Sequence, residues 1–217
     1  MAIATDVRCR LCLVTPPDYD ANRFAPALAD ALAGGDVASL IITAPRSSPQ
    51  SLQLAAEALV PVAARRGVAA LIHNDSRIAG RTKADGIHID TGIGDLATAV
   101  EAARGRQIVG VGNVTTRHDA LEAGEEEPDY IFFGRLDGDY AGTIAPKALD
   151  LASWWSSVTV IPAIVMGGNA LASVNEAAAN GIAFVALSSA VWNDPRGASA
   201  AVAEAGERLA SVLETAT

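Results

Sequence analysis

The sequence has only two cysteines, Cys9 and Cys12, which form a single Cys-x-x-Cys pair. A structural zinc site needs four ligands, and the chain has no second thiol pair to complete one. Residues three apart on a strand also point to opposite faces, which separates the two thiols. We therefore interpret them as core or strand-flank residues, with a redox or metal half-site as the alternative.

Strong positive charge and long apolar runs are absent as well. The formal net charge of −9 at pH 7 disfavours a broad nucleic-acid surface and attraction to anionic lipid. No apolar run approaches the ~20 residues that span a bilayer, and the N-terminus lacks a basic region followed by an apolar signal core. We expect a cytoplasmic protein with neither nucleic acid nor membrane as a partner. Any phosphate site must be local, built from backbone N–H groups, one or two basic residues or a metal.

Aromatic residues are scarce, at 5% of the 217 residues, although half of the chain is hydrophobic. Eight apolar runs alternate with helical patterns, and no two runs are joined by a hairpin signal. The expected strands are 11–15, 37–42, 68–72, 86–89, 108–111, 130–133, 160–166 and 183–187. The expected helices are 24–32, 50–66, a short connector after residue 72, 95–103, 118–123, 146–155, 170–179 and 196–214.

This alternation favours an all-parallel sheet, and we predict an α/β fold that is a single-domain (βα)8 TIM barrel spanning residues 1–217. A doubly wound sheet is the alternative. It would more often carry Gly-x-Gly-x-x-Gly after its first strand, where this chain has Thr15-Pro16-Pro17-Asp18.

The segment from Leu71 to Asp90 changes abruptly from apolar to polar where each of its two strands ends. Barrel enzymes build their sites from residues just after the strands, and here these are rich in carboxylates and amides. No Ser-His-Asp or Cys-His arrangement offers a convincing nucleophile, so hard-cation chemistry fits better. Asp75 with Asp90 or Asp95 would supply Mg²⁺ ligands, and solvated loop carboxylates are the alternative.

Two short motifs near the end of the chain predict a phosphate cradle. Gly167-Gly168 follows the seventh expected strand, and Ser188-Ser189 follows the eighth. Barrels often place a phosphate site after these two strands, where glycines let the backbone approach the anion. A tight turn that needs only glycine is the alternative reading.

The three histidines have different expected positions. His73 directly follows a strand, where it is either a base or ligand or, more simply, a structural hydrogen-bonding residue. His88 lies inside the fourth expected strand and should face the barrel interior. His118 should lie at the exposed start of a helix.

Six strand-end motifs occur in a characteristic order along the chain. They are Asn74-Asp75, 84–88 (ADGIH), 109–112 (VGVG), 129–134 (DYIFFG), 161–168 (IPAIVMGG) and 189–191 (SAV). This ordered set resembles the thiamine phosphate synthases and their thiazole tautomerase relatives. The resemblance covers nearly the whole chain, and the ordered set is more specific than any one motif.

The resemblance implies a transferase of thiamine biosynthesis. In that family a pyrimidine-methyl pyrophosphate ionises with Mg²⁺ on its pyrophosphate, and the nitrogen of a thiazole phosphate captures the cation. The implied partners are small phosphorylated substrates, with a homodimer among the assemblies left open. By position, the implied catalytic residues are Asn74 and Lys147, the implied substrate- and phosphate-binding residues are Arg46, Thr143, Gly167, Gly168, Ser188 and Ser189, and the implied metal ligands are Asp75, Asp90 and Asp95.

Several positions depart from the family pattern. The second strand usually ends in alternating Gln, Arg and Lys, whereas 39–44 reads SLIITA and only Arg46 follows as a partial substitute. The second metal ligand is ambiguous, because Asp90 and Asp95 lie two and seven residues past His88 instead of five. Gly112 replaces a serine, while Lys147 keeps a charge. The alternative function is therefore a thiazole tautomerase-like enzyme or a non-catalytic phosphate-binding barrel.

Overall fold

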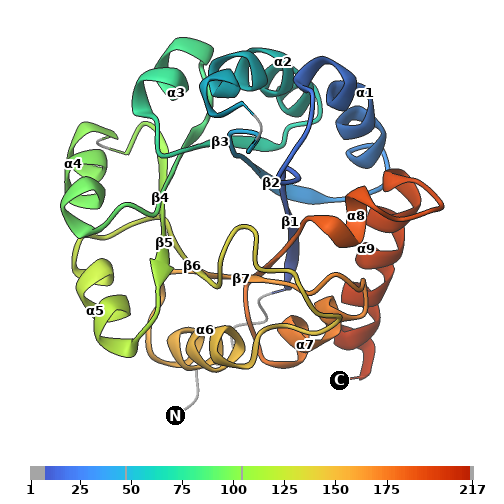
Figure 1. The fold of residues 1–217 in the computed structure, drawn as a ribbon. Coiled ribbons are helices and arrows are strands. Elements are labelled where there is room, and N and C mark those ends of the chain that lie inside the picture. The colour runs from blue at the N-terminus through green and yellow to red at the C-terminus, as the bar shows by residue number, and fades with distance from the viewer. Residues whose placement is uncertain (1–7, 47, 104, 216–217) are drawn as a thin grey trace.

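The eight strands of the computed structural model pair in chain order and close into a parallel barrel, as the alternating pattern predicted. β8 pairs back onto β1, and Figure 1 shows the helices as a ring around the strands. The structure describes residues 8–46, 48–103 and 105–215. The strands are β1 Arg10–Val14, β2 Val37–Ile42, β3 Ala69–His73, β4 Gly86–Ile89, β5 Ile108–Val114, β6 Tyr130–Phe133, β7 Ala163–Met166 and β8 Phe184–Leu187.

The helices follow the strands in the expected order. They are α1 Ala21–Ala31, α2 Leu52–Ala64, α3 Ser76–Thr82, α4 Ile93–Ala103, α5 Arg117–Glu125, α6 Pro146–Val158, α7 Ser173–Ala179, α8 Ser189–Trp192 and α9 Ala198–Thr215, with a 3₁₀ turn η1 at Pro49–Ser51. Within the described ranges, no helix combines the length and apolar character needed to cross a membrane.

Side-chain alternation along the strands divides the core into two layers. On β1, Leu11 and Leu13 face the helices, whereas Cys12 and Val14 face the barrel interior. The outer layer is much the larger, and it holds Cys9 as well. Both cysteines are free and buried, as predicted, and burial raises the pKa of Cys9 to about 12 and that of Cys12 to about 11. They are therefore protonated, unreactive thiols in the folded chain.

A few element boundaries differ from the sequence prediction for physical reasons. β7 begins at Ala163 and not at Val160, a residue that is 94% exposed. The helix predicted at 50–66 is α2 from Leu52 to Ala64, preceded by the 3₁₀ turn η1, and it continues past Pro61. The four-residue helix α8 was not predicted, since a segment that short shows no helical period.

Candidate active site

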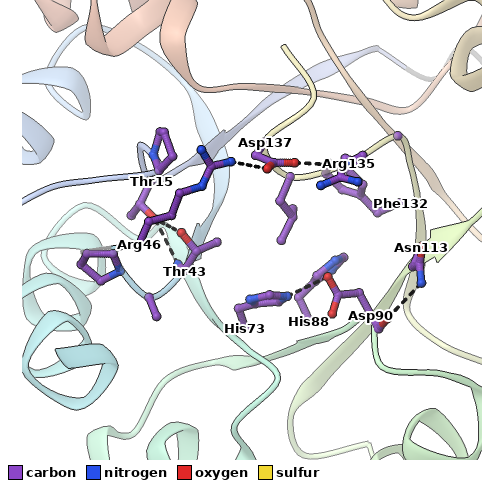
Figure 2. A pocket seen from close by; sticks show the side chains of 15 residues that line it. Thr15, Thr43, Arg46, His73, His88, Asp90, Asn113, Phe132, Arg135 and Asp137 are labelled. Carbon is purple, nitrogen blue, oxygen red and sulfur yellow. Dashed lines mark hydrogen bonds and ion pairs between the residues drawn. The ribbon is translucent and has the colours of Figure 1, made fainter. Parts of the chain in front are cut away.

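A cavity of about 620 Å³ opens among the loops that follow the strands. This is the end of the barrel at which (βα)8 enzymes generally place their active sites. Figure 2 shows its side chains in two groups, with Arg46, Asp137 and Arg135 on one side and His73, His88 and Asp90 on the other. The cavity is lined by Thr15, Pro17, Thr43, Ala44, Pro45, Arg46, His73, His88, Asp90, Asn113, Phe132, Gly134, Arg135, Leu136 and Asp137.

One side of the cavity is a hydrogen-bonded network of His73, Asn74 and Asp90. Asn74 donates from Nδ2 to Asp90 Oδ1 at 2.6 Å and accepts the Asp90 backbone N–H at 2.9 Å. His73 Nε2 lies 2.9 Å from Asp90 Oδ2. The backbone of Asn74 has φ 57°, a left-handed conformation that asparagine tolerates better than most residues. Hydrogen bonding from His73, with help from Asn74, lowers the pKa of Asp90 to about 2 against the opposing effect of burial.

His88 forms the floor of the cavity from its place on β4, beside His73 on β3. Its Nδ1 lies 2.9 Å from the Tyr130 hydroxyl, and its Nε2 is the buried ring nitrogen without a partner among the described residues. Complete burial lowers the pKa of His88 to about 3 and raises that of Tyr130 well above its usual value. Both side chains are therefore neutral at pH 7.

Two glycines on β5 make room for this pair. A Cβ at Gly110 would fall on the Tyr130 ring, and a Cβ at Gly112 would lie 2.6 Å from His88 Nε2. The Gly-x-Gly pattern of this strand is thus a packing requirement of the barrel interior. His88 faces the interior, and His118 lies exposed in the first turn of α5, as predicted for both.

The other side of the cavity carries two arginines and one carboxylate. Asp137 accepts hydrogen bonds from Arg46, which follows β2, and from Arg135 Nε at 3.0 Å. The guanidinium of Arg135, with Arg46, holds the pKa of Asp137 below its usual range, against the effect of burial. The side chains of the two arginines are 61% and 76% exposed. This side of the opening therefore has two accessible positive charges for one negative charge.

The residues of the expected phosphate cradle come together, but their donors are engaged within the chain. The Gly167 N–H donates to the Ala186 carbonyl at 2.8 Å, and the Gly168 N–H donates to Ser173 Oγ at 3.0 Å. Ser189 donates both its backbone N–H, at 2.7 Å, and its hydroxyl to Asp139 Oδ2. Ser188 is buried, with its Oγ 3.5 Å from the Thr15 carbonyl.

Thr143 and Lys147 lie at the edge of this arrangement. Both are exposed, and Lys147 stands in the first turn of α6. Lys147 lines a smaller, mainly apolar cavity of about 280 Å³ next to the central one, together with Tyr140 and Met166. The assignment of Thr143 to substrate binding and of Lys147 to catalysis stays a prediction.

The three predicted metal ligands do not meet at one point. Asp75 uses Oδ1 to cap α3, accepting the Ile78 N–H at 2.8 Å, and Asp95 is exposed in the first turn of α4. Both oxygens of Asp90 are engaged by Asn74 and His73. Among the described residues there is no group of three or more His, Cys, Asp or Glu side chains that could hold a metal. The assignment of Asp75, Asp90 and Asp95 to Mg²⁺ therefore stays a prediction.

Sequence reasoning missed three contacts of this site. It did not pair His73 with Asp90, Arg135 with Asp137, or Asp139 with Ser189. The available signal was the loop after β6, which reads GRLDGD from Gly134 and carries several charges. Loops that follow the strands lie at the barrel opening, so these charged side chains could have been expected at the site.

Comparisons with known proteins agree with one another. The family model described as thiamine monophosphate synthase matches residues 11–191. The thiamine-phosphate synthase of Rhodospirillum centenum is 34% identical over 199 residues, covering 90% of this chain and 95% of that protein. The same enzyme of Hyphomonas neptunium is 33% identical over 202 residues, covering 90% and 91%. The structure of thiamine phosphate pyrophosphorylase from Pyrococcus furiosus superposes with a TM-score of 0.78 at 19% identity, covering 95% of this chain and 98% of that one.

Proposed function

Because the chain belongs to the thiamine monophosphate synthase family, we propose that it is a transferase that makes thiamine phosphate. The substrates would be a pyrimidine-methyl pyrophosphate and a thiazole phosphate, and the second product would be pyrophosphate. The observation that carries this proposal is the 34% identity to a thiamine-phosphate synthase over 90% of the chain. The two arginines at the mouth of the central cavity support it, since they suit a polyanionic ligand.

The chemistry asks for charge stabilisation more than for acid and base groups. The bond between the pyrimidine methylene and the pyrophosphate oxygen breaks, and the electron pair leaves with pyrophosphate. The thiazole nitrogen then donates its lone pair to the methylene carbon, so no proton has to move. Arg46 and Arg135 would stabilise the negative charge that develops on the leaving group. The absence of a paired nucleophile among the cavity residues is compatible with this route.

Orientation of the two substrates would come from opposite sides of the opening. Asn74 is held rigidly by its two hydrogen bonds to Asp90, which favours a fixed amide toward the pyrophosphate. Asp75 would hold Mg²⁺, which when bound would neutralise part of the pyrophosphate charge. Gly167, Gly168 and the two serines after β8 would receive the thiazole phosphate.

The direct test is to supply the purified protein with both substrates and Mg²⁺ and to measure thiamine phosphate by chromatography. Calorimetry with each substrate alone separates binding from turnover. Product formation supports the synthase. Binding of both substrates without product, or of neither, would refute it.

One observation favours a second candidate. The residues 39–44 at the end of β2 carry no charge, although the family pattern has Gln, Arg and Lys there. A thiazole tautomerase-like enzyme or a non-catalytic phosphate-binding barrel would need only the thiazole phosphate. Calorimetry that detects thiazole phosphate but not the pyrimidine pyrophosphate with Mg²⁺ would select this candidate.

A further inference from the structure

The segment that joins β6 to α6, residues 134–145, reaches over the barrel opening, and we call it the strap (Figure 1, yellow). It contributes to the central cavity through Arg135, Leu136 and Asp137. Asp139 contacts Ser189 at the start of α8, and Asp137 contacts Arg46 in the loop after β2 as well as Arg135 in the strap itself. Each contact places a carboxylate on donors that the proposed function assigns to an anionic part of a substrate.

The first contact is made by Asp139. One of its oxygens, Oδ2, accepts both the backbone N–H of Ser189, at 2.7 Å, and the Ser189 hydroxyl. The two residues are fifty positions apart in the sequence and are brought together only by the fold. An N–H and an O–H directed at one oxygen atom make a geometry that a phosphate oxygen satisfies equally well. A carboxylate therefore occupies the position at which Ser189 would bind a phosphate.

The second contact is made by Asp137, on the opposite side of the opening. It lies between the guanidinium groups of Arg46 and Arg135, and its own side chain is 28% exposed. The two arginines present more donors than one carboxylate can use. A pyrophosphate has more oxygens and more charge than the carboxylate, so it is the stronger partner for the same donors.

Backbone contacts bring the strap close to the cradle between these two points. The Ala141 carbonyl accepts the Asn169 N–H at 2.7 Å. A Cβ at Gly168 would lie 2.6 Å from the same carbonyl oxygen, so glycine is required for this approach. The strap is thus fixed to the segments that follow β7, β8 and β2, and it lies against the cradle.

From these contacts we propose that the strap is a pseudo-substrate latch, in which Asp139 and Asp137 occupy the positions of the thiazole phosphate and the pyrophosphate. The inference rests on the proposed function for the identity of the two anions. Each substrate displaces one carboxylate, so the contacts of Asp139 with Ser189 and of Asp137 with Arg46 are both lost only when both substrates have bound. The latch lowers the apparent affinity for either anion alone, because only the fraction of molecules with that donor set free can bind it.

The experiment compares Asp139→Asn with the parent protein in titrations with inorganic phosphate at constant ionic strength. The latch predicts that Asp139→Asn binds phosphate about fivefold more tightly or better, as expected when the open fraction in the parent is about a fifth or less. Asp137→Asn should tighten inorganic pyrophosphate binding in the same way, with little effect on phosphate. Asp150→Asn is the charge-matched control, since Asp150 is an exposed residue of α6 that pairs only weakly with Arg117 at 3.7 Å.

Hydrogen exchange of the strap amides supplies a second measurement. Saturating phosphate should speed exchange in residues 137–141 of the parent protein, because the ligand removes the Asp139 contact. A strap with a purely structural role would exchange more slowly or at the same rate. Equal or weaker phosphate binding by Asp139→Asn than by the parent, including no binding by either, would overturn the latch.

Failure of the latch and failure of the proposed function give different results. If the parent protein makes thiamine phosphate but Asp139→Asn has unchanged phosphate affinity, the latch is wrong and the synthase assignment stands. If Asp139→Asn binds phosphate more tightly but neither protein makes product, the latch stands and the synthase assignment is wrong.

Discussion

Acid should destabilise this protein through His88, and the size of the effect follows from the burial of that side chain. The imidazole is fully buried and its pKa in the folded chain is about 3, whereas the unfolded chain has the ordinary value of 6.5. Below pH 6.5 the His88 imidazole therefore binds a proton in the unfolded chain but not in the folded chain. The contribution of this group to stability is complete above pH 6.5 and is lost progressively as the pH falls toward about 3.

The loss of stability per pH unit is largest where the folded and unfolded chains differ most in the number of bound protons. Between pH 7 and pH 5, linkage gives a loss of about 2 kcal/mol in the free energy of unfolding, and a folded-state value one unit higher would barely change it. His88→Phe removes the titrating group and keeps an aromatic ring, at a cost of about 1–3 kcal/mol because the Tyr130 hydroxyl is left buried without its partner. The variant should therefore be weaker at pH 7 and yet lose less stability on acidification.

Urea unfolding of the parent and His88→Phe at pH 7 and pH 5 measures this difference. His118→Gln is the control, because His118 is a surface residue and its removal should leave the difference between the two pH values nearly unchanged. An equal loss of stability on acidification in the parent and in His88→Phe would refute the argument. It would mean that His88 is not excluded from protonation by the barrel interior.

Three further outcomes are expected. Gly168→Val should weaken binding of a phosphorylated ligand by about tenfold, or about 1.4 kcal/mol, because the valine side chain would crowd a phosphate in the cradle; calorimetry measures it, and unchanged affinity would contradict it. Asp75→Ala should abolish any effect of Mg²⁺ on pyrophosphate binding and also cost about 1 kcal/mol of stability through loss of the α3 cap; an equal Mg²⁺ response would remove Asp75 from the site. Tyr130→Phe should cost about 1–3 kcal/mol in urea unfolding, because it leaves His88 Nδ1 buried without a partner, and a neutral result would show that this bond contributes nothing.

The barrel fold could be predicted from the sequence, because apolar runs alternate with helical patterns and no two runs are joined by a hairpin signal. β2, β4 and β6 have the predicted ends, since apolar runs there stop abruptly at polar residues. β7 was predicted too long at its start, because Val160 is apolar yet exposed, and hydrophobicity alone does not report which residues the chain covers.

The candidate site was predictable only in part. Strand-end position was enough to place Arg46 and Asp90 at the central cavity. It was not enough to predict that Asp90 is engaged by His73, since that contact depends on the register of β3 against β4. The contact between Asp139 and Ser189 joins two loops whose relative positions no local pattern encodes.

Because the core is divided into two layers, the two cysteine thiols can report separately on the opening of each layer. Cys9 lies in the layer between strands and helices, and Cys12 lies inside the barrel, so each thiol is shielded by a different set of neighbours. A thiol reagent reaches each one only when its own layer opens. Mass-spectrometric separation of the two labelled peptides would then tell whether the helical shell loosens before the strand barrel does or whether both layers open in a single event.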